Sequence, residues 1–286
     1  MKTVHTENSA DSSGFFIIFV CYMYSLLIRP LTKRIADNDK ASSIALRYFK
    51  FQGKIPGGRF VSRMIHGNRP GGLEREVFGL QFYNPVGLGA GLDLAGELYN
   101  DLNDLGFSFV ETGPFADLAS VRKAIANIQK DPQNDILAPC ISGDYFRSFC
   151  LAYDFFDFFV IDISDNPDMD LFDDILDARL SYDEYKPVVV KIPEDLSSEQ
   201  LDEITDYCML NSVDGIEARS IRQIGYIHSR SGGRLPIIAN CHIKTPEQAA
   251  EALESGASLI EVRMGLVRKG PRLVEQILKH LSDKNK

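Results

Sequence analysis

Small, basic and acidic side chains follow several short apolar runs of this sequence, at the points where parallel strands would end. Small residues at 89–91 would let a flat ring approach the backbone closely. A lysine after another run could stabilise negative charge on a ligand, and an aspartate could act as a general base if burial raised its pKa. The candidates for ligand contact are Gly89, Ala90, Gly91, Lys191, Asn240, Cys241, His242, Arg263 and Gly265.

Eight apolar runs alternate with amphipathic stretches, which is typical of parallel strands covered on both faces by helices. The predicted strands are residues 85–89, 109–112, 136–141, 158–163, 188–192, 215–218, 236–239 and 259–262. The predicted helices are residues 97–105, 119–129, 145–153, 171–180, 198–210, 221–229, 246–254 and 271–281. Eight units favour closure into a (β/α)₈ barrel, an α/β fold, over a doubly wound open sheet. In such a barrel the site lies at the C-terminal ends of the strands.

Local signals support these boundaries. Ser197 and Thr245 are predicted N-caps, and Gly106 and Gly256 are predicted to end helices. Residues 76–82 are predicted to form one strand that caps the barrel.

Composition excludes several classes of function. The net charge is −9 over 286 residues, and the sequence pI is about 5.1, so we expect no nucleic-acid partner, because phosphate binding draws on clustered Lys and Arg. The five cysteines form no CxxC pair, which favours reduced thiols. The five histidines show no HxxxH spacing, so no metal site is expected.

The N-terminus carries a membrane signal. Residues 15–28 are uncharged and are followed by Arg29, Lys33 and Arg34. Fourteen apolar residues are fewer than the roughly 20 that a spanning helix needs. We therefore expect a monotopic anchor in the membrane interface, while a hydrophobic helix docked on the barrel stays open. Met23 is an alternative start to Met1.

Several motifs resemble one enzyme family, the class 2 dihydroorotate dehydrogenases, over about residues 22–281. Residues 76–97 (EVFGLQFYNPVGLGAGLDLAGE) are similar to the family's first-strand motif, and 105–113 (LGFSFVETG) to the second. Residues 188–204, 213–218 and 232–278 resemble later strands and the last third of the barrel. The segment LLIRPLTKR resembles the family's N-terminal segment, which is associated with membrane and quinone access. Loops after strands 2, 4 and 6 look shortened.

The resemblance implies an FMN-binding barrel that oxidises dihydroorotate to orotate in pyrimidine synthesis and passes the electrons to quinone. It assigns FMN contact to the nine ligand candidates named above, with Lys191 beside the flavin. It also implies that Asp165 stands at the position of the family's catalytic serine, with Ser164 beside it. The implied location is peripheral, on the cytoplasmic side of the inner or cell membrane.

The sequence departs from the family pattern where the substrate would bind. Leu94 replaces a lysine, Cys140 an asparagine, and Arg219, Ser220 and Ile221 an asparagine with threonines. Cys241 and His242 replace two glycines, and Arg263 and Met264 a tyrosine–threonine pair. An unpaired buried polar group costs roughly 1–3 kcal/mol, so these losses together would remove most affinity for orotate.

Three hypotheses follow. The first is a dihydroorotate dehydrogenase-like flavin barrel, a pseudoenzyme with weakened or lost catalysis. The second is an active FMN oxidoreductase on dihydroorotate or another small substrate. The third is a non-catalytic scaffold docked on a membrane. In each, residues 1–54 form a membrane-associating extension and 55–286 the barrel.

Overall fold

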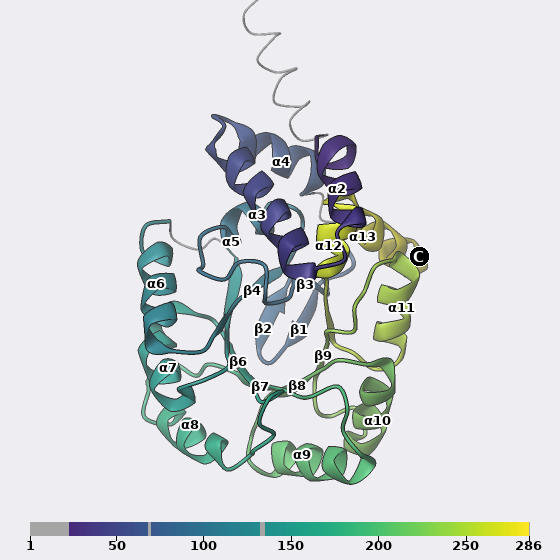
Figure 1. Ribbon diagram of the computed structural model, residues 1–286. Coiled ribbons are helices and arrows are strands. Elements are labelled where there is room, and N and C mark those ends of the chain that lie inside the picture. The colour runs from purple at the N-terminus through teal and green to yellow at the C-terminus, as the bar shows by residue number, and fades with distance from the viewer. Residues whose placement is uncertain (1–22, 68–69, 132–134, 286) are drawn as a thin grey trace, which may run out of the picture.

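The computed structural model describes residues 23–67, 70–131 and 135–285. Eight parallel strands close into a barrel in the order β10-β3-β4-β5-β6-β7-β8-β9, and Figure 1 shows helices ringing it. The strands are β3 (Val86–Leu88), β4 (Phe109–Phe115), β5 (Ile136–Ile141), β6 (Phe159–Asp162), β7 (Val188–Lys191), β8 (Gly215–Ala218), β9 (Ile237–Ala239) and β10 (Leu259–Glu261). The predicted barrel is confirmed, and the doubly wound alternative is wrong.

The outer helices lie close to their predicted positions. They are α5 (Tyr99–Asn103), α6 (Leu118–Ile128), α7 (Tyr145–Ala152), α8 (Leu171–Arg179), α9 (Ser198–Leu210), α10 (Ile221–Ser231), α11 (Pro246–Glu254) and α13 (Arg272–Lys284), with a 3₁₀ turn η2 (Tyr153–Phe155). The Ser197 side chain accepts a hydrogen bond from Gln200 N within a capping box, and Thr245 caps α11 in the same way. Gly106 and Gly256 adopt φ of +101° and +112°, a region that favours glycine. These end signals are confirmed.

Two local predictions differ from the structure. Residues 76–82 form a hairpin of β1 (Arg75–Val77) and β2 (Leu80–Phe82), because Phe78 and Gly79 turn the chain with positive φ. Helix α12 (Met264–Lys269), directly after β10, was not predicted. Its six residues are too few for a visible apolar period.

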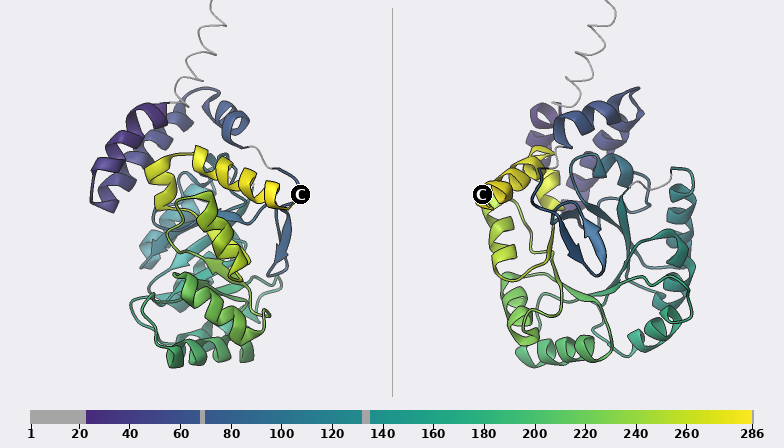
Figure 2. Two further views of the ribbon diagram at one scale, coloured as in Figure 1. Left: turned by 90° about the vertical axis from the view of Figure 1, so that its right-hand side faces the viewer. Right: turned by 180° about the vertical axis from the view of Figure 1, so that it is seen from behind.

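Aromatic rings fill the end of the barrel where the strands begin. Figure 2 shows the β1–β2 hairpin lying across that end. Phe82 packs edge-on against Phe109 with ring centroids 5.5 Å apart, and Phe109 packs against Phe158 at 5.9 Å. Gly87 leaves room for the Phe109 ring, which a β-carbon there would meet at 2.1 Å. This plug closes one end, so the open end is the one where the strands finish, called the mouth below.

The N-terminal extension packs on one side of the barrel, against α12 (Figure 1). From here on the name covers residues 24–66, which include one helix beyond the predicted bound at 54: a π-helical turn η1 (Tyr24–Ile28), α2 (Arg29–Arg34), α3 (Asn38–Lys54) and α4 (Gly58–His66). Tyr24 is fully buried, and its hydroxyl donates a hydrogen bond to the Val267 carbonyl at 2.7 Å. No helix in the described ranges is long and apolar enough to cross a membrane. Of the predicted anchor, residues 15–22 lie outside the described residues.

Candidate active site

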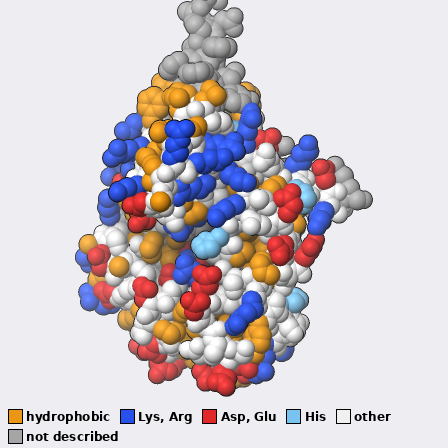
Figure 3. All heavy atoms as spheres, turned by 45° about the vertical axis from the view of Figure 1, so that its right-hand side comes forward, with side chains coloured by type: hydrophobic (Ala, Val, Ile, Leu, Met, Phe, Trp, Pro, Cys, Tyr) orange, Lys and Arg blue, Asp and Glu red, His pale blue; other side chains and the backbone are white. Residues whose placement is uncertain are grey.

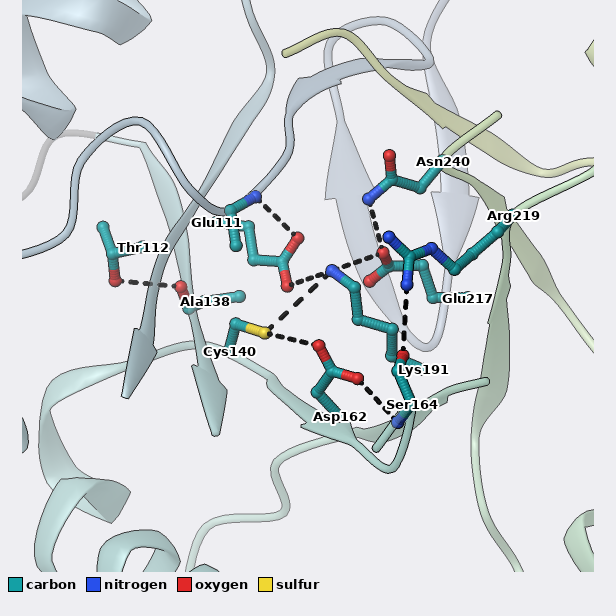
Figure 4. Close-up of polar contacts among 11 residues, drawn as sticks. Glu111, Thr112, Ala138, Cys140, Asp162, Ser164, Lys191, Glu217, Arg219 and Asn240 are labelled. Atoms are coloured by element: carbon teal, nitrogen blue, oxygen red, sulfur yellow. Dashed lines mark hydrogen bonds and ion pairs between the residues drawn. The ribbon is translucent and has the colours of Figure 1, made fainter. Parts of the chain in front are cut away.

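A charged layer of side chains lies above the aromatic plug, inside the barrel. Side chains of a strand alternate between its two faces, and every second position here points inward. The inward positions at the strand ends hold Glu111 of β4, Cys140 of β5, Lys191 of β7 and Glu217 of β8, drawn in Figure 4. Glu261 of β10 completes the layer. All five side chains are buried.

Lys191 is the only cation of this layer and is held by two of its carboxylates. Its ammonium lies 2.7 Å from Glu217 Oε1 and 3.4 Å from Glu111 Oε1 (Figure 4). Burial opposes the charge on Lys191, but the surrounding carboxylates outweigh burial and hold its pKa well above the ordinary value. The lysine therefore stays protonated and paired at neutral pH.

The carboxylates have different environments. Glu111 Oε2 accepts a hydrogen bond from Ala90 N at 3.1 Å, and Glu217 Oε1 accepts one from the Asn240 amide at 2.7 Å. Burial, reinforced by Glu111, raises the pKa of Glu217 to about 7. Burial likewise raises the pKa of Glu261 well above its usual range. Two of the three carboxylates thus resist ionisation.

Above this layer the mouth holds a cavity of about 160 Å³. Its lining includes six predicted ligand residues: Ala90, Gly91, Lys191, Asn240, His242 and Arg263. Asp162, Arg219, Cys140 and Pro114 complete the lining. The strand ends therefore bring most of the predicted ligand residues together.

The remaining predicted residues lie beside this cavity. Gly89 faces the Glu261 carboxylate, which a β-carbon at 89 would meet at 2.6 Å. Gly265 lies close to the Ile243 carbonyl oxygen, which a β-carbon at 265 would meet at 2.3 Å. Cys241 is half-buried, and burial raises its pKa to about 11, so it is a thiol at neutral pH.

Of the two predicted catalytic residues, neither lines the cavity. Asp165 is exposed, and Ser164 Oγ accepts a weak hydrogen bond from the Arg219 guanidinium at 3.4 Å. Asp162, two residues before Ser164, reaches the cavity instead, and its Oδ1 accepts from Ser164 N at 2.9 Å. The carboxylate that β6 brings to the mouth is therefore Asp162.

His242 and Arg263, two positions at which the sequence departs from the family pattern, show how side chains change the mouth. His242 adopts φ of +56°, a conformation that costs a non-glycine residue roughly 1 kcal/mol or more. Arg263 extends over Gly91, where a β-carbon would meet its guanidinium at 2.8 Å. The backbone at 242 thus retains a glycine-like form, while side chains fill space above it.

Sequence reasoning missed Glu111, Glu217 and Glu261. Each is a single acid inside an apolar strand, in the runs FVE, GIE and LIE. Glutamate is almost never fully buried unless paired. A glutamate inside a run that is predicted to be a buried strand could therefore have indicated a paired, buried carboxylate.

Comparisons with known proteins agree on one family. A family model described as dihydroorotate dehydrogenase matches residues 212–284. A dihydroorotate dehydrogenase (quinone) of Christiangramia forsetii is 27% identical over 339 aligned positions, covering 92% of this chain and 99% of the relative. Because 339 positions exceed the 286 residues of this chain, the alignment opens gaps in it.

Solved structures share the fold. The crystal structure of DHODH from Eimeria tenella in complex with ferulenol superposes with a TM-score of 0.74 at 18% identity, covering 90% of this chain and 94% of that one. A mandelate oxidase mutant solved with a monooxide FMN adduct has a TM-score of 0.51 at 16% identity, covering 74% and 77%. The order of the motifs, the closed barrel and the relatives aligned over most of their length together show that this chain is a distant homologue of the dihydroorotate dehydrogenases (quinone).

Proposed function

We propose that this chain is a dihydroorotate dehydrogenase-like barrel that has lost turnover of dihydroorotate and does not hold FMN in the manner the family resemblance implies. The observation that carries the proposal is the occupation of the mouth by the chain's own charged side chains. Lys191 is paired with Glu217, and Arg263 lies against Gly91. Both positions were predicted to face a flavin.

The residues present do not fit the flavin ring. Gly89 and Gly91 would offer bare backbone to a flat ring, but a carboxylate and a guanidinium cover these two glycines. The cavity of about 160 Å³ is smaller than the roughly 300–1,000 Å³ of pockets that enclose drug-sized ligands. Such pockets are mostly apolar, whereas half of the residues lining this cavity carry Asp, Lys, Arg or His side chains.

The substrate side of the mouth is also unsuited to an anion that needs several amide partners. Asp162 lines the cavity and would repel a carboxylate such as that of dihydroorotate. Cys140 lies where the family has an asparagine, and burial raises its pKa well above the ordinary value, so it offers only a neutral thiol. Leu94, at the position of a family lysine, is 56% exposed and supplies no cation.

A flavin titration combined with an activity assay tests the proposal. The full chain is purified, incubated with excess FMN, desalted and scanned for flavin absorbance near 450 nm. Dihydroorotate-dependent reduction of a quinone analogue is then measured, with the Christiangramia forsetii relative as the positive control. We expect neither stoichiometric flavin nor turnover. Stoichiometric FMN would refute the first half of the proposal, and turnover would refute the second.

We further propose that the N-terminal extension docks on the cytoplasmic face of a membrane. Six exposed large apolar side chains lie on it, at Leu26, Leu27, Leu31, Phe51, Phe60 and Met64. Figure 3 shows hydrophobic side chains at this end of the molecule with Lys and Arg side chains beside them. Apolar groups next to basic ones favour an interfacial position at anionic headgroups. A quinone could accept electrons only from a chain that carries FMN. The flavin absorbance test therefore also decides whether a quinone is a partner.

Vesicle flotation tests the docking. The full chain is mixed with vesicles that contain anionic lipid and separated on a density gradient. Replacing Leu26, Leu27 and Leu31 by Ser should move the protein from the vesicle fraction to the soluble one. Leu180→Ser with Leu210→Ser is the matched control, because these leucines are even more exposed but lie on the barrel. Equal flotation of both variants would refute docking through the extension.

A further inference from the structure

Three buried carboxylates converge inside the barrel below the cavity. Glu111, Glu217 and Glu261 come from strands β4, β8 and β10, and each offers one oxygen such that the three oxygens lie within 4.8 Å of one another. The residues are 0%, 0% and 2% exposed. Buried charges are paired or coordinate metals, because an isolated one is very costly to desolvate. When it is ionised, the cluster therefore requires compensating positive charge.

The chain supplies only part of that charge. Among the described residues, the cation that pairs with this cluster is Lys191, through Glu217 and Glu111. One ammonium against three carboxylates leaves two positive charges missing when all four groups are ionised. A single divalent cation would supply both.

The hydrogen bonds show where such a cation would lie. Lys191, Ala90 and Asn240 donate to Glu111 and to Oε1 of Glu217. In contrast, both oxygens of Glu261 and Oε2 of Glu217 are buried without any hydrogen-bond donor. The unpartnered Glu261 carboxylate is aimed into the cluster, since its oxygen is one of the three that converge. Three of the cluster's buried oxygens are thus acceptors that no donor reaches.

We propose that Glu111, Glu217 and Glu261 form a binding site for a hard divalent cation of the Ca²⁺ or Mn²⁺ kind. Carboxylate oxygens are the ligands such ions prefer. Ca²⁺ bonds oxygen at 2.3–2.6 Å, so two of its ligands can be up to about 5 Å apart. The three oxygens, within 4.8 Å of one another, can therefore reach one Ca²⁺ ion. The cation would enter from the mouth, because Lys191 and Asn240 both line the cavity and contact the cluster.

The competing account is that two protons neutralise the cluster, one of them shared between Glu261 and Glu111. Protons would leave the site without affinity for metal. The two accounts therefore differ in one measurable quantity, the presence of a saturable metal site that depends on Glu261.

Manganese titration provides the test. The full-length protein is treated with a chelator, exchanged into metal-free buffer and titrated with Mn²⁺ while free Mn²⁺ is followed by electron paramagnetic resonance. We expect one site per chain, displaced by Ca²⁺. Glu261→Gln keeps the shape of the side chain but removes its charge, and should weaken binding at least tenfold. Glu203→Gln, an exposed acid on α9, is the matched control and should leave binding unchanged.

Thermal unfolding gives a second readout that does not depend on any enzymatic activity. Mn²⁺ should raise the Tm of the unsubstituted protein, because a ligand that binds only the folded state stabilises it. It should not raise the Tm of Glu261→Gln beyond what weak surface binding gives. If the unsubstituted protein lacks a saturable site, or binds Mn²⁺ no more tightly than Glu261→Gln, the proposal is overturned and protons balance the cluster. Should Glu261→Gln fail to fold, Glu217→Gln serves as the second variant under the same criteria.

Discussion

Tyr24 allows a quantitative test of how firmly the N-terminal extension is attached to the barrel. Its ring is fully buried, stacks on Phe49 with centroids 5.5 Å apart and meets Tyr48 edge-on at 5.0 Å. Its hydroxyl donates to the Val267 carbonyl of α12 at 2.7 Å. Truncating a large buried aromatic side chain to alanine costs about 3–5 kcal/mol. We therefore expect Tyr24→Ala to lower the free energy of unfolding by about 4 kcal/mol.

The hydroxyl contributes less than the ring. Tyr24→Phe keeps the ring and removes one buried hydrogen bond, which costs about 1 kcal/mol. Leu26→Ala is the matched control, because this neighbouring side chain is 62% exposed and should change stability by less than about 0.5 kcal/mol. The expected order of destabilisation is Tyr24→Ala, then Tyr24→Phe, then Leu26→Ala.

Urea unfolding followed by circular dichroism measures these values. A lower midpoint with an unchanged m-value means lost stability of one cooperative unit. Tyr24→Ala within 1 kcal/mol of the unsubstituted protein would refute the reasoning, because it would mean that the extension unfolds independently of the barrel. A separate early transition that Tyr24→Ala alone affects would refute it in the same way.

Three further outcomes are expected from buried groups and a helix cap. Burial lowers the pKa of His66 from 6.5 to about 4, so folding favours the neutral imidazole. The free energy of unfolding is therefore highest above pH 6.5 and falls by about 3 kcal/mol as the pH drops to 4. Urea titrations should show this loss in the unsubstituted protein and not in His66→Leu. Arg179 is 4% exposed and pairs with Asp214 at 2.7 Å, so Arg179→Met should cost about 3–5 kcal/mol by leaving that carboxylate without its cation, and thermal melts showing no loss would contradict the pairing. Ser197→Ala should cost about 1 kcal/mol through the lost cap of α9, whereas Ser197→Asp should largely retain the stability.

The periodic parts of the chain were predictable from sequence because their cause is local. Strands β5 and β8 and helices α9 and α11 have the predicted bounds, since apolar runs, caps and glycines mark their ends. The order of eight such units was enough to favour the barrel over an open sheet. The hairpin was missed because Phe78 turns the chain with φ of +57°, which is uncommon for an aromatic residue.

The site was predictable only in part, because its chemistry depends on pairing across strands. The expectation that the site lies at the C-terminal ends of the strands correctly located Ala90, Gly91 and Lys191 around the cavity. It did not reveal that Glu217 takes up the ammonium of Lys191, because that contact joins two separate strands. Nor did it reveal that Asp162, and not Asp165, reaches the cavity, because the chain bends away after β6.

The aromatic plug has a consequence for how ions and water reach the interior. Phe82, Phe109 and Phe158 are almost completely buried and seal the barrel below the charged layer. An ion or small molecule that reaches Glu261 is then expected to enter through the mouth, whose lining includes Lys191 and Asn240. Exchange of the buried carboxylates with bulk solvent is therefore expected to depend on how the side chains that line the mouth move.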